Sequence, residues 1–420
     1  MPSNFTKQEQ VMFDDLIEGF DDLLVTAKLA TKYDVPSPAE MVRARDQFWI
    51  PAPMIGSTYD GFDQTSNFGD LTETQIPVSI GYHKVDPRKF SAKDMRNQQA
   101  LNAWGKAAKQ KLASDINFAL AQTVALQGSI VVKRTVAPTG FDDVALVDAA
   151  MTEVGITTAD RKMLLAPRVY NAMAGDLAKR ASGSARDETA YSRARIGDIA
   201  GFDTFKNDVP VNLTAAGGGA TTINGANQTY VPKATVTDSL GVDVNVDNRY
   251  SDLVITAANY ANIKAGDAFT IAGVNSVHMI TKQDTGQLQT FRVISKPAAN
   301  TIRIAPALIS GADGARASAE YKNVTATPAN GAVLTWLNTV AAPVNPFWVK
   351  DALLLLPGSY SVDPEDGWQV MRATTDAGIA VTYTRQGEIN DLSVKARFEV
   401  DFGTALTTPQ MAGVELFNQT

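Results

Sequence analysis

The sequence contains no cysteine and only two histidines among its 420 residues. Without cysteine the chain cannot form a disulfide framework, a thiolate nucleophile or a zinc–cysteine site. The histidines, His83 and His278, fall in different predicted modules, and neither accompanies a nucleophile motif such as Gly-x-Ser-x-Gly. Phosphate-binding loops of the Gly-x-x-x-x-Gly-Lys or Gly-x-Gly-x-x-Gly type are also missing. The sequence therefore offers little support for an enzyme, and it predicts no cofactor and no metal site.

Long apolar runs and a basic charge balance are missing as well. The longest aliphatic run, Leu353 to Leu356, is far too short to cross a bilayer, and the first residues lack the pattern of a secretory signal. The net charge is −7, whereas proteins that bind nucleic acid tightly usually carry a basic surface. We therefore expect no membrane span and no tight, direct contact with nucleic acid.

Residues 6–31 are predicted to form an amphipathic helix. Thr6 and Glu9 have the spacing of a capping box, and apolar residues recur behind them at steps of three and four. The opposite face is acidic and carries Asp14, Asp15, Glu18, Asp21 and Asp22. Such a helix is either a solvated lid or a docking arm.

Residues 48–85 are predicted to form a long hairpin. Ile76, Val78 and Ile80 alternate with smaller or polar residues, which is the period of a strand. Prolines at positions 51, 53 and 77 favour edge strands, because proline cannot donate to a strand ladder. A hairpin of this kind cannot bury both faces alone, so it needs a neighbour, which could be another subunit.

The longest predicted helix runs from Ser91 to Gly128 without an internal proline. At 1.5 Å per residue it would be roughly 54 Å long, so other parts of the chain must pack against it. Its apolar row recurs every four residues and consists of Trp104, Ala108, Leu112, Ile116, Leu120 and Val124.

The predicted secondary structure changes twice between residues 142 and 343. Residues 142–212 show a mixed α/β pattern, and after an uncharged stretch at 213–230 short β-type runs recur at the spacing of a barrel until about residue 343. Two local patterns there look like sites. The three glycines at 217–219 lack a following basic residue, so a flexible turn is predicted, and residues 243–249 lack the glycine and closing glutamate of a calcium loop.

Six stretches share their order and spacing with a known family: Lys32–Pro51, Leu126–Val132, Ile199–Phe205, Val244–Tyr250, Lys264–Val274 and Asn345–Leu353. On these stretches the chain resembles the major coat proteins of short-tailed bacteriophages of the Salmonella temperate type. The resemblance implies an α+β chain with the tailed-phage major capsid fold and an inserted antiparallel β-barrel. The implied parts are an N-arm helix and connection (1–47), an extended loop (48–85), a peripheral domain with the spine helix (86–141), the first part of an axial domain (142–212), the insertion domain (213–343) and a return to the axial and peripheral domains (344–420).

The same resemblance implies partners. The chain would assemble with copies of itself into the hexamers and pentamers of an icosahedral shell, in the cytoplasm of a bacterial host, with a scaffolding protein and with a portal at one vertex. The shell would later enclose packaged double-stranded DNA without tight specific binding. The acidic residues Asp14, Asp15 and Glu18 would meet the basic end of the scaffolding protein.

The insertion domain would carry a loop, at about residues 235–243, that reaches across the two-folds between capsomers. Asp238 and Asp243 are available there for ion pairs, although this loop has few charges and places Leu240 within it. Simple turn residues are an equally good interpretation of both aspartates.

Two alternative functions stay open at this point. One is another virion structural protein, such as a tail, portal or adhesin component with an Ig-like module, although a portal would show more long helices. The other is a carbohydrate-active hydrolase with a β module, which would need clustered carboxylates or an activated nucleophile in one domain. Assembly size separates these hypotheses, because a coat protein forms shells and an enzyme runs as a monomer or small oligomer.

Overall fold

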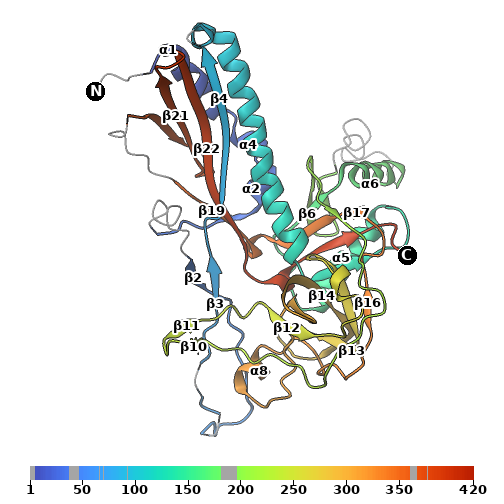
Figure 1. Cartoon of the computed structure of the whole chain (residues 1–420). Coiled ribbons are helices and arrows are strands. Elements are labelled where there is room, and N and C mark those ends of the chain that lie inside the picture. Colours follow the sequence, from blue (N-terminus) through green and yellow to red (C-terminus); the bar gives the residue numbers. More distant parts are fainter. Residues whose placement is uncertain are drawn as a thin grey trace. The chain divides into compact units, whose positions relative to one another are not determined.

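The computed structural model describes residues 5–36, 47–65, 67–69, 71–91, 93–180, 196–359, 367–375 and 377–420, and the side chains of 177–180 are not among these. The chain divides into two compact units (Figure 1). Unit 1 comprises Met1–Phe48, Val78–Leu120 and Leu353–Ala405, and unit 2 comprises Trp49–Pro77, Ala121–Ala352 and Leu406–Thr420. No helix within the described ranges is both long enough and apolar enough to cross a membrane.

Unit 1 is built on a six-stranded sheet with a helix along one face (Figure 1). Strand β22 (Ser393–Leu406) lies at its centre and pairs antiparallel with both β21 (Ala380–Glu388) and β4 (Tyr82–Ser91). The remaining strands are β20 (Gln369–Thr374), β19 (Leu353–Pro357) and the short β1 (Thr31–Lys32). Strands β21 and β22 form a hairpin whose turn lies at residues 389–392.

The long helix α4 (Gln98–Gln127) has 30 residues, so it is about 45 Å long and shorter than the sequence predicts. Ser91 and Asp94 hydrogen-bond to each other, but they start a short 3₁₀ turn, η2 (Asp94–Arg96), instead of the helix. The helix starts after Asn97, whose side-chain oxygen accepts hydrogen bonds from two amides of the first turn. The prediction of a helix starting at Ser91 is wrong for this reason.

The apolar row of α4 faces the sheet of unit 1. Trp104, Leu112, Ile116 and Leu120 are all buried. The Trp104 ring lies 4.4 Å from the Phe398 ring, between centroids, and its indole Nε1 donates to Asp86 at 2.9 Å. Because the indole N–H is satisfied, this tryptophan can be buried without an unpaired donor.

The N-terminal segment is not the continuous helix that the sequence predicts. It consists of α1 (Lys7–Ile17), the 3₁₀ turn η1 (Asp21–Leu23) and α2 (Val25–Leu29). The interruption follows from Gly19, whose φ of +69° lies in the left-handed region that ends helices. The capping box at the start of α1 is present, since Thr6 and Glu9 bond each other's backbone amides.

Unit 2 contains a mixed six-stranded sheet covered by two helices. Its strands, in spatial order, are β5 (Ile130–Lys133), β23 (Ala412–Leu416), β18 (Asn345–Val349), β6 (Arg161–Leu165), β8 (Phe202–Lys206) and β7 (Asp198–Ile199). The helices α5 (Phe141–Glu153) and α6 (Pro167–Arg180) contribute buried Val144, Met151 and Met173 to the same core as the sheet. The sheet mixes parallel and antiparallel pairs, as in α+β domains.

The insertion, also in unit 2, is a five-stranded antiparallel sheet. Its order is β12 (Ser251–Val254), β15 (Thr301–Ala305), β14 (Asp284–Ala298), β13 (Ala268–Val277) and β16 (Leu334–Trp336). The sequence predicts an antiparallel β-barrel, and the structure shows an antiparallel sheet whose two outer strands both hydrogen-bond to the segment 221–224, at Val254 and at Leu334. A core of aliphatic and aromatic side chains fills the space between the strands.

The three glycines ahead of this sheet are packed against it. A Cβ atom at Gly218 would lie 2.1 Å from the Trp336 ring, and one at Gly217 would lie 2.8 Å from the Asn262 carbonyl oxygen. The Trp336 indole also donates to the Gly219 carbonyl oxygen at 3.0 Å. Glycine is needed at position 218 because the backbone there passes directly over a tryptophan.

Candidate functional site

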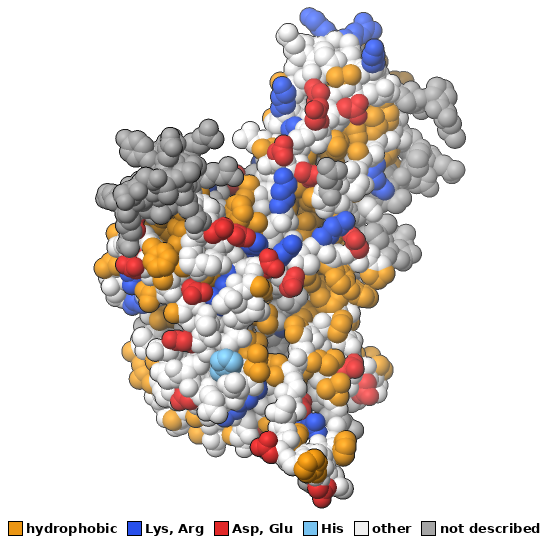
Figure 2. Space-filling model, turned by 180° about the vertical axis from the view of Figure 1, so that it is seen from behind, with side chains coloured by type: hydrophobic (Ala, Val, Ile, Leu, Met, Phe, Trp, Pro, Cys, Tyr) orange, Lys and Arg blue, Asp and Glu red, His pale blue; other side chains and the backbone are white. Residues whose placement is uncertain are grey.

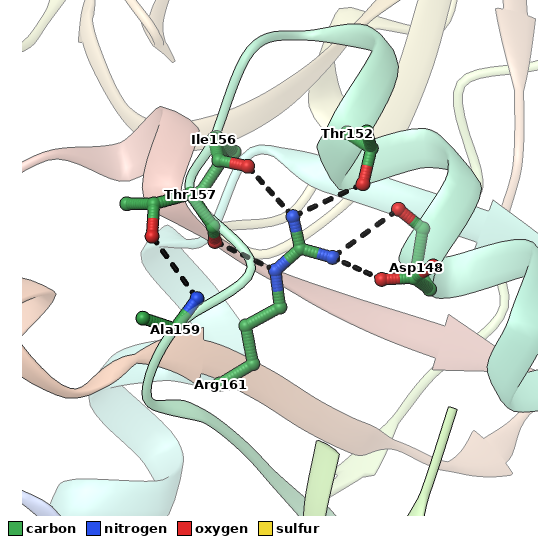
Figure 3. Close-up of polar contacts among 6 residues, drawn as sticks. All are labelled: Asp148, Thr152, Ile156, Thr157, Ala159 and Arg161. Atoms are coloured by element: carbon green, nitrogen blue, oxygen red, sulfur yellow. Dashed lines mark hydrogen bonds and ion pairs between the residues drawn. The ribbon is translucent and has the colours of Figure 1, made fainter. Parts of the chain in front are cut away.

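The most elaborate buried polar cluster surrounds Arg161 of β6 (Figure 3). Its guanidinium donates from Nε to the Thr157 carbonyl oxygen at 2.9 Å. Nη2 donates to the Ile156 carbonyl oxygen at 2.7 Å and to Thr152 Oγ1 at 3.2 Å. Nη1 donates to both the backbone and the side-chain oxygen of Asp148. Burial lowers the pKa of Arg161, and the charge of Asp148 acts in the opposite direction. All five N–H donors of the guanidinium are used, so the cluster holds α5 to β6 and has no donor left for a ligand.

The two histidines also make structural contacts. His83 lies in unit 1 with Nδ1 at 2.5 Å from Asp401 and Nε2 at 3.7 Å from Glu399. His278 lies in unit 2, where Nδ1 accepts hydrogen bonds from the amides of Ile280 and Thr281. Within the described parts of the chain, no three His, Asp or Glu side chains are grouped closely enough to hold a metal ion.

The acidic residues of α1 point away from the unit that carries them. Asp14 and Glu18 are exposed and Asp15 is half-buried. Lys109 of α4 donates to the backbone carbonyl oxygens of Asp15 (3.0 Å) and Glu18 (2.5 Å), so it caps the end of α1 without neutralising the carboxylates. As far as the structure describes the chain, none of the three carboxylates forms an ion pair, and they remain available to a partner.

A buried ion pair that the sequence did not indicate fixes α1 to the sheet. Glu9 is fully buried, accepts a hydrogen bond from Tyr383 Oη at 3.1 Å and pairs with Arg385. Burial and the neighbouring Glu9 charge raise the pKa of Tyr383. The arm is therefore held at its first turn, and Asp14 and Glu18 remain exposed.

The loop between β2 (Phe48–Pro51) and β3 (Gln75–Val78) exposes several large apolar side chains. Phe62 is fully exposed and Phe68 is 86% exposed. The other exposed members are Met54, Tyr59 and Leu71. Hydrophobic side chains are visible at the end of this loop, at the bottom of Figure 2. Apolar side chains gathered on one loop mark a contact surface more strongly than scattered ones do.

A second apolar projection is the hairpin of β10 (Thr235–Thr237) and β11 (Asp243–Asn245) in the insertion. Its tip residue Leu240 is 85% exposed, and Val236, Val242 and Val244 are exposed as well. The aspartates serve the hairpin itself. Asp238 accepts hydrogen bonds from the amides of Leu240 (2.8 Å) and Val242 (3.0 Å), and Asp243 accepts one from Thr237 Oγ1 (2.8 Å). These contacts are those of turn residues, and they leave the apolar side chains facing outward.

Two more buried ionisable groups escaped the sequence analysis, both in unit 2. Arg292 of β14 donates to the carbonyl oxygens of Gly266 (2.8 Å) and Ala125, so it ties the insertion to the last turn of α4, and burial lowers its pKa to about 10. Glu415 of β23 has no hydrogen-bond partner for either carboxylate oxygen. Burial first, and repulsion by Asp143 second, raise the pKa of Glu415 to about 8. No local sequence pattern around Arg292 or Glu415 indicates that these residues are buried.

The family model described as "P22 coat protein - gene protein 5" matches residues 1–418. Among solved structures, the chain is similar to that of "Mycobacterium phage Che8" at 11% identity, with 93% of this chain and 90% of that chain covered and a TM-score of 0.44. For the capsid of the cyanophage P-SCSP1u the identity is 12%, the coverage 93% and 87%, and the TM-score 0.42.

A third solved structure is the CUS-3 coat protein I-domain, with 39% identity over 28% of this chain and 95% of that chain and a TM-score of 0.22. The family match spans nearly the whole sequence, both units and the insertion included. The protein is accordingly a major capsid protein that forms the shell of a virion, and the chain belongs to the P22 coat protein family.

Proposed function

We propose that the chain assembles, together with a scaffolding protein, into an icosahedral procapsid of hexamers and pentamers that has a portal at one vertex and later encloses packaged double-stranded DNA. The observation that carries this proposal is the pair of exposed apolar projections, the loop with Phe62 and Phe68 and the hairpin with Leu240. Neither projection buries these side chains within its own chain, and a shell supplies many copies of the same neighbour. Many weak contacts of this kind become strong together when a shell closes.

The parts of the chain take the roles that the sequence analysis assigns to them. Residues 1–47 act as the N-arm and its connection, of which 37–46 lie outside the described residues. Residues 48–85 act as the extended loop, 86–141 as the peripheral domain, 142–212 with part of 344–420 as the axial domain, and 213–343 as the insertion domain. The five-stranded sheet of β12 to β16 supports a separate module within 213–343.

The acidic face of α1 is the proposed docking site for the basic end of the scaffolding protein. Asp14 and Glu18 are exposed, and the backbone beside them is fixed by Lys109, so a partner does not need to order the helix on binding. An interaction between exposed charges weakens with salt, because the screening length is about 8 Å at physiological ionic strength. We expect Asp14→Asn with Glu18→Gln to weaken scaffolding binding, and Asp208→Asn, an exposed acid of unit 2, to leave it unchanged.

The hairpin is the proposed contact across the two-folds between capsomers, and its chemistry is apolar. The hydrogen bonds within the hairpin use one carboxylate oxygen each of Asp238 and Asp243, and the exposed Leu240 and Val242 supply the apolar surface for a neighbour. Leu240→Asp should therefore reduce shell formation strongly, whereas Asp243→Asn should have a small effect. The reverse order of effects would show that the contact is ionic.

The chain acts without enzymatic activity in this proposal. Its buried arginine cluster has no free donor, and its histidines contact backbone amides and buried carboxylates. The hydrolase alternative would need a group of carboxylates open to a substrate.

The test is negative-stain electron microscopy of the protein expressed with and without its scaffolding partner. Closed shells of uniform size in the presence of the partner, and irregular or absent shells without it, support the proposal. A monodisperse monomer under every assembly condition would overturn it.

A further inference from the structure

The loop between β2 and β3 is tied to the insertion at two of its backbone carbonyls. Arg316 Nη1 donates to the Asn67 carbonyl oxygen at 2.8 Å, and Tyr321 Oη donates to the Thr72 carbonyl oxygen at 3.3 Å. Arg316 begins the short helix α8 (Arg316–Glu320), and Tyr321 follows it. Both the loop and this helix belong to unit 2, so the two contacts are made within one compact body.

Arg316 is itself held in place. Its Nε donates to Glu320 Oε1 at 2.8 Å one helical turn further on, and the Glu320 side chain is only 5% exposed. The hydrogen bond that Arg316 donates to Glu320 raises the pKa of Arg316. The guanidinium is therefore fixed by its own helix before it meets the loop, which reduces the entropy lost on forming the contact.

The loop has adapted to this guanidinium. A Cβ atom at Gly69 would lie 2.7 Å from Arg316 Nη1 and 3.3 Å from its Cδ. The backbone of the loop thus passes directly against the arginine, at a distance that only glycine permits without displacement. The Asn67 carbonyl oxygen and Gly69 therefore form the part of the loop that contacts Arg316, here called the seat.

The contacts hold the loop by its backbone and leave its apolar side chains in water. Phe62, Phe68 and Leu71 stay exposed while Asn67 and Thr72 are bound. At the base of the loop, a cavity of about 320 Å³ is lined by Ile55 and Ile76 from the loop side and by Ile309 and Tyr321 from the insertion side, among others. Because side chains do not fill this space, the hydrogen bonds to the Asn67 and Thr72 carbonyl oxygens contribute more than side-chain packing to the position of the loop.

We propose that Arg316 and Tyr321 are positioning residues for assembly: they order the loop in the unassembled subunit and so present its apolar side chains to a second copy of the chain. A loop without such contacts would lose backbone freedom on docking, and this loss opposes association. The hydrogen bonds that Arg316 and Tyr321 donate to the loop, here called the tether, remove that loss before two subunits meet. This inference rests on the proposed function of the loop as a contact between subunits.

The first test measures the tether alone, by hydrogen–deuterium exchange of the full-length, unassembled subunit. Peptides covering residues 59–72 should exchange at least several-fold faster in Arg316→Ala and in Tyr321→Phe than in the unaltered chain. The matched control is Arg303→Ala, which removes an exposed insertion arginine that pairs with Asp252. Unchanged exchange of the loop in both tether variants would overturn the inference.

A third variant guards against loss of folding in Arg316→Ala, which also leaves the buried Glu320 without its partner. Gly69→Ala keeps both charges of the Arg316–Glu320 pair in the chain, and its methyl group would lie 2.7 Å from Arg316 Nη1, so the guanidinium and the loop cannot both keep their present positions. It should raise loop exchange as the tether variants do. Exchange equal to that of the unaltered chain would count against the seat described for Arg316.

The second test measures the consequence, as the critical subunit concentration for shell formation with scaffolding protein. The tether variants should raise it about tenfold, which corresponds to about 1.4 kcal/mol per subunit, whereas Arg303→Ala should not. Faster loop exchange with an unchanged critical concentration would overturn the positioning role. The double variant Phe62→Ser, Phe68→Ser distinguishes the proposed function of the loop from the ordering role of the tether. Normal assembly of this variant would overturn the loop as a contact between subunits, whereas the exchange result for the tether would be unaffected.

Discussion

Replacing Glu415 by glutamine should stabilise the chain at neutral and alkaline pH. In the folded chain, both carboxylate oxygens are buried without a hydrogen-bond partner, and burial raises the pKa to about 8. Repulsion from Asp143 adds to the shift, and the charge of Arg134 opposes it. In the unfolded chain the same group has its ordinary pKa of 4.5. Between these two values the folded state keeps a proton that the unfolded state has released.

The sign of the effect follows from proton linkage. Because the folded state binds more protons in this window, the free energy of unfolding falls as the pH rises from about 4.5 to about 8. Each pKa unit corresponds to about 1.4 kcal/mol, so the loss reaches on the order of 3 kcal/mol at pH 7. Glutamine is neutral at every pH and resembles the protonated acid in shape, so the variant avoids this loss.

The assay is urea unfolding of the unassembled subunit at pH 5 and at pH 8. Glu415→Gln should resemble the unaltered chain at pH 5 and should unfold at a clearly higher urea concentration at pH 8, with an unchanged slope. Glu153→Gln, at an exposed glutamate of the same unit, serves as the control and should show no such difference. A stability difference between Glu415→Gln and the unaltered chain that is the same at both pH values would refute the argument.

Three further substitutions test contacts described above, each by urea unfolding. Arg161→Met leaves the Ile156 and Thr157 carbonyl oxygens without their donor, at about 1–3 kcal/mol for each buried group left unpaired, whereas Arg303→Ala at an exposed pair should cost under about 1 kcal/mol; equal costs would contradict the role of burial. Arg292→Met should cost a similar few kcal/mol, because Asp267 keeps its buried charge without the nearby cation, and a neutral effect would show that the tie to α4 contributes nothing. Gly218→Ala places a methyl group against Trp336 and should destabilise the insertion by about 1–3 kcal/mol, whereas Gly56→Ala, at a glycine of the same unit that also lacks a positive φ and whose Cβ would meet no neighbour, should change stability little.

The elements that the sequence predicts correctly are those with a local signal. The alternation at Ile76, Val78 and Ile80 predicts one buried face, and all three are buried. The four-residue row from Trp104 to Val124 predicts one long helix with a buried stripe, and α4 has it. In both cases the period of the side chains is that of the backbone conformation itself.

The boundaries were harder to predict, because a single residue decides them. Gly19 adopts a left-handed conformation and ends α1, although the apolar period continues through it. Ser91 and Asp94 have the spacing of a helix cap, but Asn97 caps α4 instead. A spacing rule cannot separate such neighbouring candidates, because each satisfies the same local hydrogen-bond pattern.

The buried ions could not be predicted, because their partners are distant in the sequence. Arg292 reaches the carbonyl oxygen of Ala125, 167 residues away, and Glu9 pairs with Arg385, 376 residues away. A signal for the exposed surfaces did exist, since Leu240 is an apolar residue inside a polar loop. The ionic role of the aspartates beside it stays a prediction, and each also accepts a hydrogen bond within its own hairpin.

The distance between Glu9 and Arg385 also has a consequence for the time course of synthesis. At roughly 5–20 residues per second, the ribosome needs on the order of 20–75 s to add the strand that receives α1. During this interval the apolar stripe of α1, with Met12, Phe13 and Leu16, has no sheet to cover it. The insertion sheet, in contrast, is encoded in one contiguous stretch and can fold as soon as β16 has left the ribosome. During synthesis the insertion sheet can therefore form before α1 docks, because α1 needs strand β21 near the other end of the chain.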